Sequence, residues 1–191
     1  MKKIEAVLSD MDGTLIETDE ANATAYCNAL RKFGFEYSVD DFITTFRGES
    51  WKVFLPQITS LSLEECKDIA VEKRNTYKNH LHLTKLNHHV LQMLILAKKD
   101  TLIGLVTTAS KGAVEDLVSF HKLKDLFDVI ITGDDVSIGK PNPEPYFVAA
   151  KKLGVDIKNC TIFEDSEIGL QSARASGAFV FLVATNATIG G

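Results

Sequence analysis

Hydrophobic and polar positions divide the chain into segments with strand and helix patterns. Short apolar runs, typical of strands buried on both faces of a sheet, occur at residues 6–9, 102–106, 129–131, 161–163 and 179–183. Between the later runs, apolar residues recur at the three- and four-residue spacing of amphipathic helices. This alternation predicts an α/β fold, a Rossmann-like three-layer core in which helices cover both faces of a parallel sheet.

A long block after the first run has helical spacing only. Within it, Ser62 and Glu65 form a capping box, which marks the start of a helix. The pattern therefore predicts an all-helical domain at residues 17–84. This domain is inserted into a core formed by residues 1–16 and 85–191.

Two helix boundaries in this pattern depend on single residues. Pro56 is expected to end a short helix that begins near Glu49, because proline has no backbone N–H to donate. Ser110 is expected to cap the helix that follows the run at 102–106, because serine is a favoured N-cap residue.

Composition places the chain among ordinary globular proteins. Of its 191 residues, 45% are hydrophobic and 25% charged, which allows a core of normal size. The net charge of −5, without a Lys/Arg cluster, argues against a nucleic-acid partner, and no apolar run approaches the length of a membrane span. Cys27, Cys66 and Cys160 form no C-x-x-C pair, so a reducing cytoplasmic location is predicted. The sequence leaves the oligomeric state open, with a monomer as the expectation.

Polar side chains gather directly after the apolar runs or in the loops that follow them. They are Asp10, Asp12, Thr107, Lys140, Glu164 and Asp165. Because ligands of parallel sheets bind beyond the carboxyl ends of the strands, we expect these side chains to share one site.

The residue types in this group suit a phosphoryl group bound beside a magnesium ion. Carboxylates as close as Asp10 and Asp12 repel each other, and a divalent cation with oxygen ligands removes that repulsion. The hydroxyl of Thr107 and the ammonium of Lys140 suit an anion next to the metal. An Asp carboxylate facing phosphorus can act as a nucleophile, and a second carboxylate can transfer the proton.

Each of these residues also has an ordinary structural explanation. Thr107 alone is typical of a strand end, and Lys140 alone of a solvated loop. Glu164-Asp165-Ser166 alone suits the start of a helix. Their occurrence together, at successive strand ends, favours a site over coincidence.

The segments around these residues resemble four motifs of a known family. They are DMDGTL at 10–15, Thr107 after an apolar strand, GKPNPEPY at 139–146 and FEDSEIGL at 163–170. In this order they are similar to the haloacid dehalogenase superfamily, in particular its phosphatase and β-phosphoglucomutase-like branch. The resemblance covers nearly the whole chain. It implies a sheet ordered 5-4-1-2-3, with the first strand central, and a helical cap that closes to exclude water.

The resemblance also implies a role for each residue of the site. Asp10 would be the nucleophile and Asp12 the general acid and base. Thr107 and Lys140 would hold the phosphoryl group. The ligands of Mg²⁺ would be Asp10, the backbone carbonyl of Asp12, Asp165, and Glu164 either directly or through water.

Two further residues are expected to contact the substrate. Thr108 follows Thr107 where many relatives have Asn, so one orienting amide is replaced by a hydroxyl. Arg47 lies in a short loop of the helical domain, at the place where relatives contact their substrates. A surface charge is the alternative explanation for Arg47.

The resemblance implies a Mg²⁺-dependent phosphatase that hydrolyses a small phosphorylated metabolite through an aspartyl-phosphate. A sugar-phosphate mutase is the alternative, because Asp12 serves both activities. Carbon–halogen hydrolysis is disfavoured, because it needs neither Mg²⁺ nor the acid at Asp12. A phospho-accepting signalling receiver is more remote, because it takes its phosphate on a middle strand, where this chain has Thr107.

Overall fold

The computed structural model describes residues 3–184, which form two compact units. The core unit contains the residues up to Glu17 and those from Leu86 onward, and the helical unit is Thr18–Lys85. Each boundary lies one residue further along the chain than the sequence pattern predicts. The chain passes between the units through two short paired strands, β2 (Ile16–Glu17) and β3 (Lys85–Leu86).

The core unit is built on a five-stranded parallel sheet. Its strands are β1 (Ala6–Ser9), β4 (Leu102–Val106), β5 (Val129–Ile131), β6 (Cys160–Glu164) and β7 (Phe179–Leu182). The spatial order is β5-β4-β1-β6-β7. These labels include β2 and β3, so they differ from the expected numbering. Counted among themselves from β7 to β5, the strands of this sheet follow the order 5-4-1-2-3.

The strand register brings the ends of β1, β4 and β6 to the same level of the sheet. Ser9, the last residue of the central strand β1, pairs with Leu105 of β4 and with Phe163 of β6. The next residue of each chain segment therefore lies at the same edge. These residues are Asp10, Val106 and Glu164.

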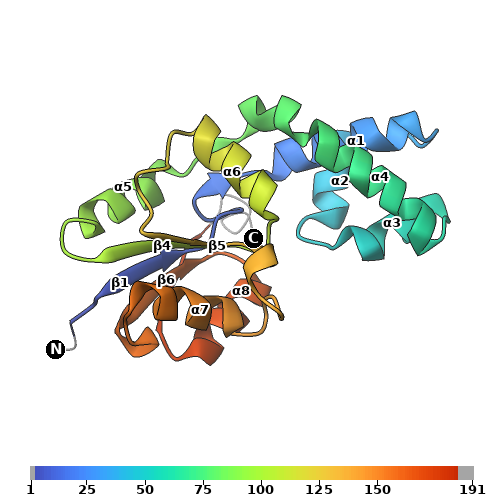
Figure 1. The fold of residues 1–191 in the computed structure, drawn as a ribbon. Helices are drawn as coiled ribbons and strands as arrows, with labels where there is room; N and C mark the ends of the chain where they lie inside the picture. The colour runs from blue at the N-terminus through green and yellow to red at the C-terminus, as the bar shows by residue number, and fades with distance from the viewer. Residues whose placement is uncertain (1–2, 185–191) are drawn as a thin grey trace. The chain divides into compact units, whose positions relative to one another are not determined.

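Helices cover both faces of this sheet, as the alternating pattern predicts (Figure 1). Helices α5 (His88–Ala97) and α6 (Lys111–Phe120) lie on one face, and α7 (Glu144–Leu153) and α8 (Glu167–Ser176) on the other (Figure 1). On the second face, alternate strand residues such as Leu8 and Ile162 pack in one buried cluster with Tyr146 of α7. The predicted α/β core with a parallel sheet is confirmed.

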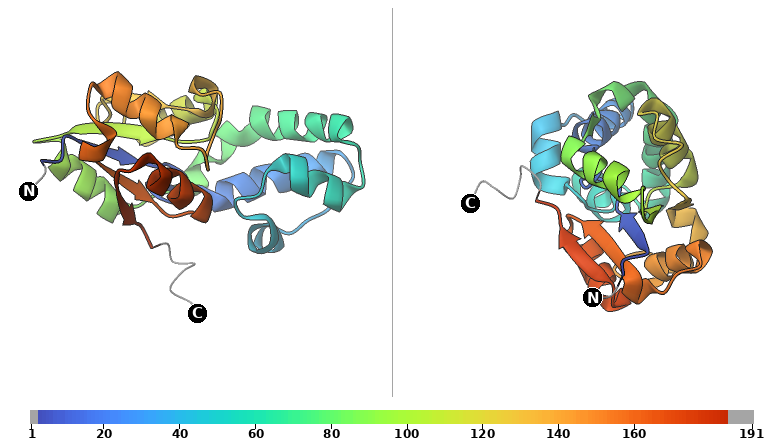
Figure 2. Two further views of the ribbon diagram at one scale, coloured as in Figure 1. Left: turned by 90° about the horizontal axis from the view of Figure 1, so that it is seen from below. Right: turned by 90° about the vertical axis from the view of Figure 1, so that its left-hand side faces the viewer.

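The helical unit consists of helices packed around a cluster of aromatic rings. Its elements are α1 (Asp19–Lys32), α2 (Val39–Phe46), α3 (Trp51–Thr59), α4 (Leu63–Thr76) and the 3₁₀ helix η1 (Tyr77–Leu83). Helices α1 and α4 pack side by side and antiparallel (Figure 2, left). The capping box of Ser62 and Glu65 starts α4 as expected. Phe54 lies at the centre of the cluster, with its ring 5.1 Å from both Tyr26 and Phe42.

Of the two helix boundaries that depend on single residues, the one at Pro56 is wrong, whereas the one at Ser110 is confirmed without the expected capping bond. Helix α3 does not end at Pro56 but continues to Thr59. A proline inside a helix costs about 3 kcal/mol, through the lost hydrogen bond and the clash of its ring with the preceding turn, and the complete burial of Leu55 beside it offsets part of that cost. Ser110 occupies the N-cap position of α6, but its side chain makes no capping hydrogen bond.

Two observations bear on the environment of the protein. Within residues 3–184, the helices are too short or too polar to cross a bilayer. The three cysteines, Cys27, Cys66 and Cys160, are buried and form no disulfide. Their free state agrees with their irregular spacing in the sequence.

Replacement of Phe54 by Ala is expected to destabilise the helical unit by about 3–5 kcal/mol, because it removes the ring at the centre of the cluster. The single tryptophan, Trp51, lies in the same helix and reports unfolding of this unit by fluorescence in denaturant. Its neighbour Val53 is 50% exposed, and Val53→Ala should change stability by less than about 0.5 kcal/mol. Equal effects of the two substitutions would contradict this account of the core.

Candidate active site

The turn after β1 fixes Asp10 and brings Asp165 close to it. The backbone N–H of Asp10 donates to Phe163 O (2.9 Å), which extends the pairing with β6. Gly13 has a φ of +84°, and a Cβ at this position would lie 2.4 Å from Asp165 Oδ2. Thr14 Oγ1 donates to Asp165 Oδ1 (2.7 Å). Only glycine fits position 13, because it allows both the turn and the close approach of the carboxylate.

Lys140 connects three strand ends through its ammonium group. It donates hydrogen bonds to Asp10 Oδ1 (2.6 Å), Glu164 Oε1 (2.6 Å) and Val106 O (3.0 Å). The Lys140 side chain is only 3% exposed, and its Nζ lies 5.1 Å from the ring centre of Tyr146. An ammonium has three protons to donate, so each is used within the site.

Glu164 is fully buried and accepts hydrogen bonds on both carboxylate oxygens. Tyr146 OH donates to Oε1 (2.8 Å), and the backbone N–H groups of Asp165 (3.2 Å) and Ser166 (3.4 Å) donate to Oε2. Burial raises the pKa of Tyr146 well above its usual value, so the phenol keeps the proton that it donates. The carboxylate packs against the first turn of α8, where a Cβ on Gly169 would lie 2.0 Å from Oε1.

Thr107 links the end of β4 to Asp12. Its Oγ1 donates to Asp12 Oδ2 (3.3 Å) and accepts from the backbone N–H of Ala109 (3.0 Å). Thr107 is buried and Asp12 half-buried, whereas the neighbouring Thr108 is exposed. The hydroxyl of Thr107 therefore has two partners, the side chain of Asp12 and the backbone of Ala109.

The site contains more negative than positive charge. The ammonium of Lys140 contacts the carboxylates of Asp10 and Glu164, while Asp165 lies beside these two and the charge of Asp12 also acts on Asp10. Burial raises the pKa of Asp10 to about 8; Glu164 and Asp12 add to this effect, and Lys140 opposes it. Burial lowers the pKa of Lys140, but the interactions with its neighbours, Asp10 first among them and Glu164 in addition, together raise it overall, so the lysine stays charged. The single positive charge of Lys140 therefore does not balance the negative charge of these carboxylates.

A divalent cation fits this donor set. Asp10, Glu164 and Asp165 each offer an oxygen atom, and these atoms lie within 4.8 Å of one another. Oxygen ligands from carboxylates are the ones that Mg²⁺ prefers, and its charge would balance the surplus. The carboxylate of Asp12 lies outside this group, so its expected part in metal binding rests on its backbone carbonyl.

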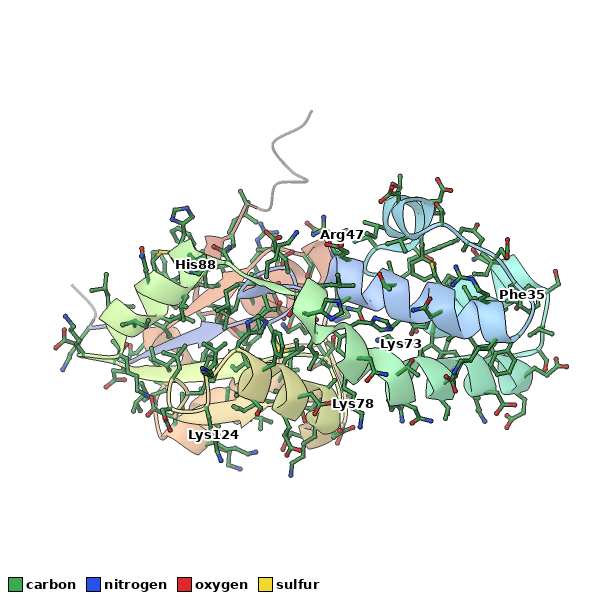
Figure 3. The ribbon with its side chains drawn as sticks, turned by 90° about the horizontal axis from the view of Figure 1, so that it is seen from above. Phe35, Arg47, Lys73, Lys78, His88 and Lys124 are labelled. Carbon is green, nitrogen blue, oxygen red and sulfur yellow. The ribbon has the colours of Figure 1, made fainter. Side chains whose placement is uncertain are left out.

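Arg47 belongs to the helical unit, whereas the residues described above belong to the core unit. Its Nε forms an ion pair with Asp19 Oδ2 (2.8 Å), and it lines a cavity of about 230 Å³ within the unit. Lys73 of α4 lines the same cavity, and Figure 3 labels both residues. The floor of the cavity is aromatic and aliphatic, and Arg47 and Lys73 supply its positive charges.

Sequence reasoning did not assign a site role to Tyr146, Gly169 or Thr14. Tyr146 ends the motif at 139–146 without an assigned role, yet its hydroxyl bonds to Glu164. A signal was present, because a tyrosine on the buried face of a helix needs a polar partner for its hydroxyl. The sequence did not indicate a role for Gly169, because a glycine within a helix does not predict contact with the Glu164 carboxylate.

Comparison with known proteins identifies the family of the chain. The sequence model of the haloacid dehalogenase-like hydrolases matches residues 7–183. The chain belongs to this family. The resemblance of its four motifs and the prediction of a hydrolase of this family are therefore confirmed. Membership in this family argues against the alternative of a phospho-accepting signalling receiver.

Several named proteins are similar to this chain over most of their length. The phosphorylated carbohydrates phosphatase of Thermotoga maritima is 31% identical over 182 residues, which cover 91% of this chain and 82% of that protein. Fructose-1-phosphate phosphatase YqaB of Escherichia coli (strain K12) is 25% identical, with 92% of this chain and 94% of that protein covered. The crystal structure of a putative β-phosphoglucomutase from Thermotoga maritima superimposes with a TM-score of 0.77 at 29% identity, covering 95% and 86% of the two chains.

Substitution of Gly169 by Ala should lower the free energy of unfolding by about 1–3 kcal/mol, because the new methyl group overlaps a carboxylate that is held on both oxygens. Gly112 in α6 is the matched control, because no atom lies within 4 Å of the position of its Cβ. Gly112→Ala should raise stability by up to about 1 kcal/mol, through helix propensity. Thermal unfolding measures both effects, and shifts of the same sign would contradict the packing argument.

Proposed function

We propose that this protein is a Mg²⁺-dependent phosphatase that hydrolyses a small phosphomonoester through an aspartyl-phosphate on Asp10. The observation that carries the proposal is the buried ammonium of Lys140, which joins Asp10 to Glu164 at the carboxyl edge of the sheet. Phosphatase names among the relatives support the same reaction. The expected metal ligands are Asp10, Glu164, Asp165 and the backbone carbonyl of Asp12.

We expect the reaction to proceed in two steps. In the first, a carboxylate oxygen of Asp10 attacks phosphorus, and the bond from phosphorus to the leaving oxygen breaks. Asp12 donates its proton to that oxygen. In the second, Asp12 takes a proton from water, and the water oxygen displaces Asp10 from phosphorus. Inorganic phosphate leaves, and both aspartates return to their starting states.

Positive charge is needed throughout, because the nucleophile and the phosphoryl group are both anionic. Lys140 supplies part of it, in contact with Asp10 Oδ1. When bound, Mg²⁺ would screen the charge between the carboxylates and the phosphoryl oxygens. Thr107 is the expected hydroxyl donor to the phosphoryl group, with Thr108 beside it at the exposed end of the strand.

A sugar-phosphate mutase is the second candidate, favoured by the similarity to the putative β-phosphoglucomutase structure. Asp12 would serve this reaction equally, by taking the proton from another hydroxyl of the substrate as that oxygen accepts the phosphoryl group from Asp10. The products distinguish the two activities. Stoichiometric release of inorganic phosphate indicates the phosphatase, and isomerisation with little free phosphate indicates the mutase.

Phosphorylated sugars are the first substrates to test, because two of the similar phosphatases are named for sugar phosphates or phosphorylated carbohydrates. We propose that Arg47 contributes to substrate recognition from the helical unit. A cytoplasmic location and a monomeric state remain predictions of the sequence.

Replacement of Asp10 by Asn should reduce phosphate release by several orders of magnitude, because the amide oxygen is a far weaker nucleophile than the carboxylate. Phosphate release is measured on a panel of phosphorylated sugars, nucleotides and small acids with Mg²⁺, and chelation of the metal should abolish it. Asp100→Asn, at an exposed position, controls for the change of charge. Full turnover by Asp10→Asn on the esters that the parent hydrolyses would refute the assignment of Asp10 as the nucleophile.

Replacement of Arg47 by Ala should raise KM for the best substrate about three- to tenfold, through loss of a charged hydrogen bond. It should leave the unfolding midpoint nearly unchanged, because the ion pair with Asp19 is partly exposed. Arg31→Ala, at another exposed arginine of the helical unit, is the control. Equal KM values for the parent and Arg47→Ala would remove Arg47 from substrate recognition.

A further inference from the structure

The loop after β4, residues 107–111, is held from outside by the neighbouring strand and turn. The backbone N–H of Thr107 donates to Ile131 O of β5 (3.0 Å). Two residues on, Ala109 O accepts from the backbone N–H of Gly133 (2.8 Å). At the end of the loop, the backbone N–H of Lys111 donates to Asp134 Oδ2 (2.8 Å). These bonds tie the loop to the 3₁₀ turn η2 (Gly133–Asp135).

The hydrogen bond from Lys111 to Asp134 caps the N-terminus of α6. Ser110 stands at the N-cap position of α6 without a capping hydrogen bond from its side chain. The carboxylate of Asp134 accepts from the first residue of the helix instead, although it belongs to another segment of the chain. An acceptor on the helix itself would fix only the start of α6. An acceptor on η2 also fixes the loop relative to β5.

Gly133 brings the turn and the loop unusually close. A Cβ at this position would lie 2.5 Å from the backbone oxygen of Thr108. This oxygen cannot move unless the loop moves with it, so the contact leaves no space for any other residue. The residue next to Thr107 is therefore located by direct backbone contact with η2.

The turn η2 is itself firmly held. Asp135 Oδ2 accepts from the backbone N–H (2.9 Å) and the Oγ1 (2.7 Å) of Thr132. These bonds lower the pKa of Asp135 and keep it ionised. Lys152 of α7 donates to its other oxygen (3.3 Å). The turn can therefore act as a fixed support for the loop.

We propose that Asp134 is a positioning residue for phosphoryl binding, acting through the loop that carries Thr107. It contacts no reacting atom. Its carboxylate holds the backbone of Lys111, and with Gly133 it sets the position of the Thr107 hydroxyl. The inference rests on the proposed role of Thr107 as a phosphoryl ligand.

Calorimetric titration of the Mg²⁺-loaded protein with inorganic phosphate tests this role without requiring turnover. Asp134→Ala should bind phosphate about three- to tenfold more weakly, the size expected for a lost N-cap acceptor. Asp134→Asn should bind nearly as the parent does, because its amide oxygen can accept the same hydrogen bond. Gly133→Ala should bind more weakly than Asp134→Ala, because its methyl group displaces the loop directly.

Asp156 provides a matched control. Its Oδ1 accepts from the backbone N–H of Lys158 (2.9 Å) and caps the short turn η3 (Ile157–Asn159) before β6, at the opposite end of the strands. Asp156→Ala should lower the unfolding temperature about as much as Asp134→Ala, with unchanged phosphate affinity. A merely structural role of Asp134 would give the two variants the same affinity.

The inference is overturned if Asp134→Ala binds phosphate as tightly as the parent, or if Asp134→Asn binds as weakly as Asp134→Ala. Failure of the parent to bind phosphate overturns it together with the role of Thr107. A parent that binds phosphate but hydrolyses no ester contradicts the proposed function alone. Hydrolysis by the parent, with equal phosphate affinity in all variants, contradicts this inference alone.

Discussion

The buried ammonium of Lys140 is the interaction on which the site depends. It lies between the carboxylates of Asp10 and Glu164 and also bonds to the last carbonyl of β4. Removal of such a charge would leave two carboxylates buried without a partner, which is far more costly than losing an exposed ion pair. The parallel register makes the arrangement possible, because it brings the ends of β1, β4 and β6 to one level.

Close packing around the carboxylates is the second constraint. Glycine is required at position 13 because Asp165 approaches the backbone there, and at position 169 because Glu164 does. These contacts fix the carboxylate oxygens within a few ångströms of one another. The same packing that holds the fold together thus prepares a site with surplus negative charge, which suits a divalent cation.

Much of the fold and the site could be predicted because the signals are local. The apolar runs gave the strands, and Ser62 with Glu65 gave the start of α4. Predictions failed where packing outweighed local preference. Pro56 lies inside α3 because Phe54 and Leu55 before it are buried. The first N–H of α6 is capped by Asp134 instead of Ser110, because another segment lies within reach.

The sequence by itself determined the family, the order of strands and helices along the chain, and the residue types that meet at the strand ends. Their partners were decided only by the tertiary structure. Lys140 bonds to Asp10 across 130 positions of the chain, and Tyr146 of helix α7 bonds to Glu164 at the end of strand β6. Spacing along a sequence specifies helices and strands but not contacts between them. Such contacts depend on strand register and on the space left between side chains.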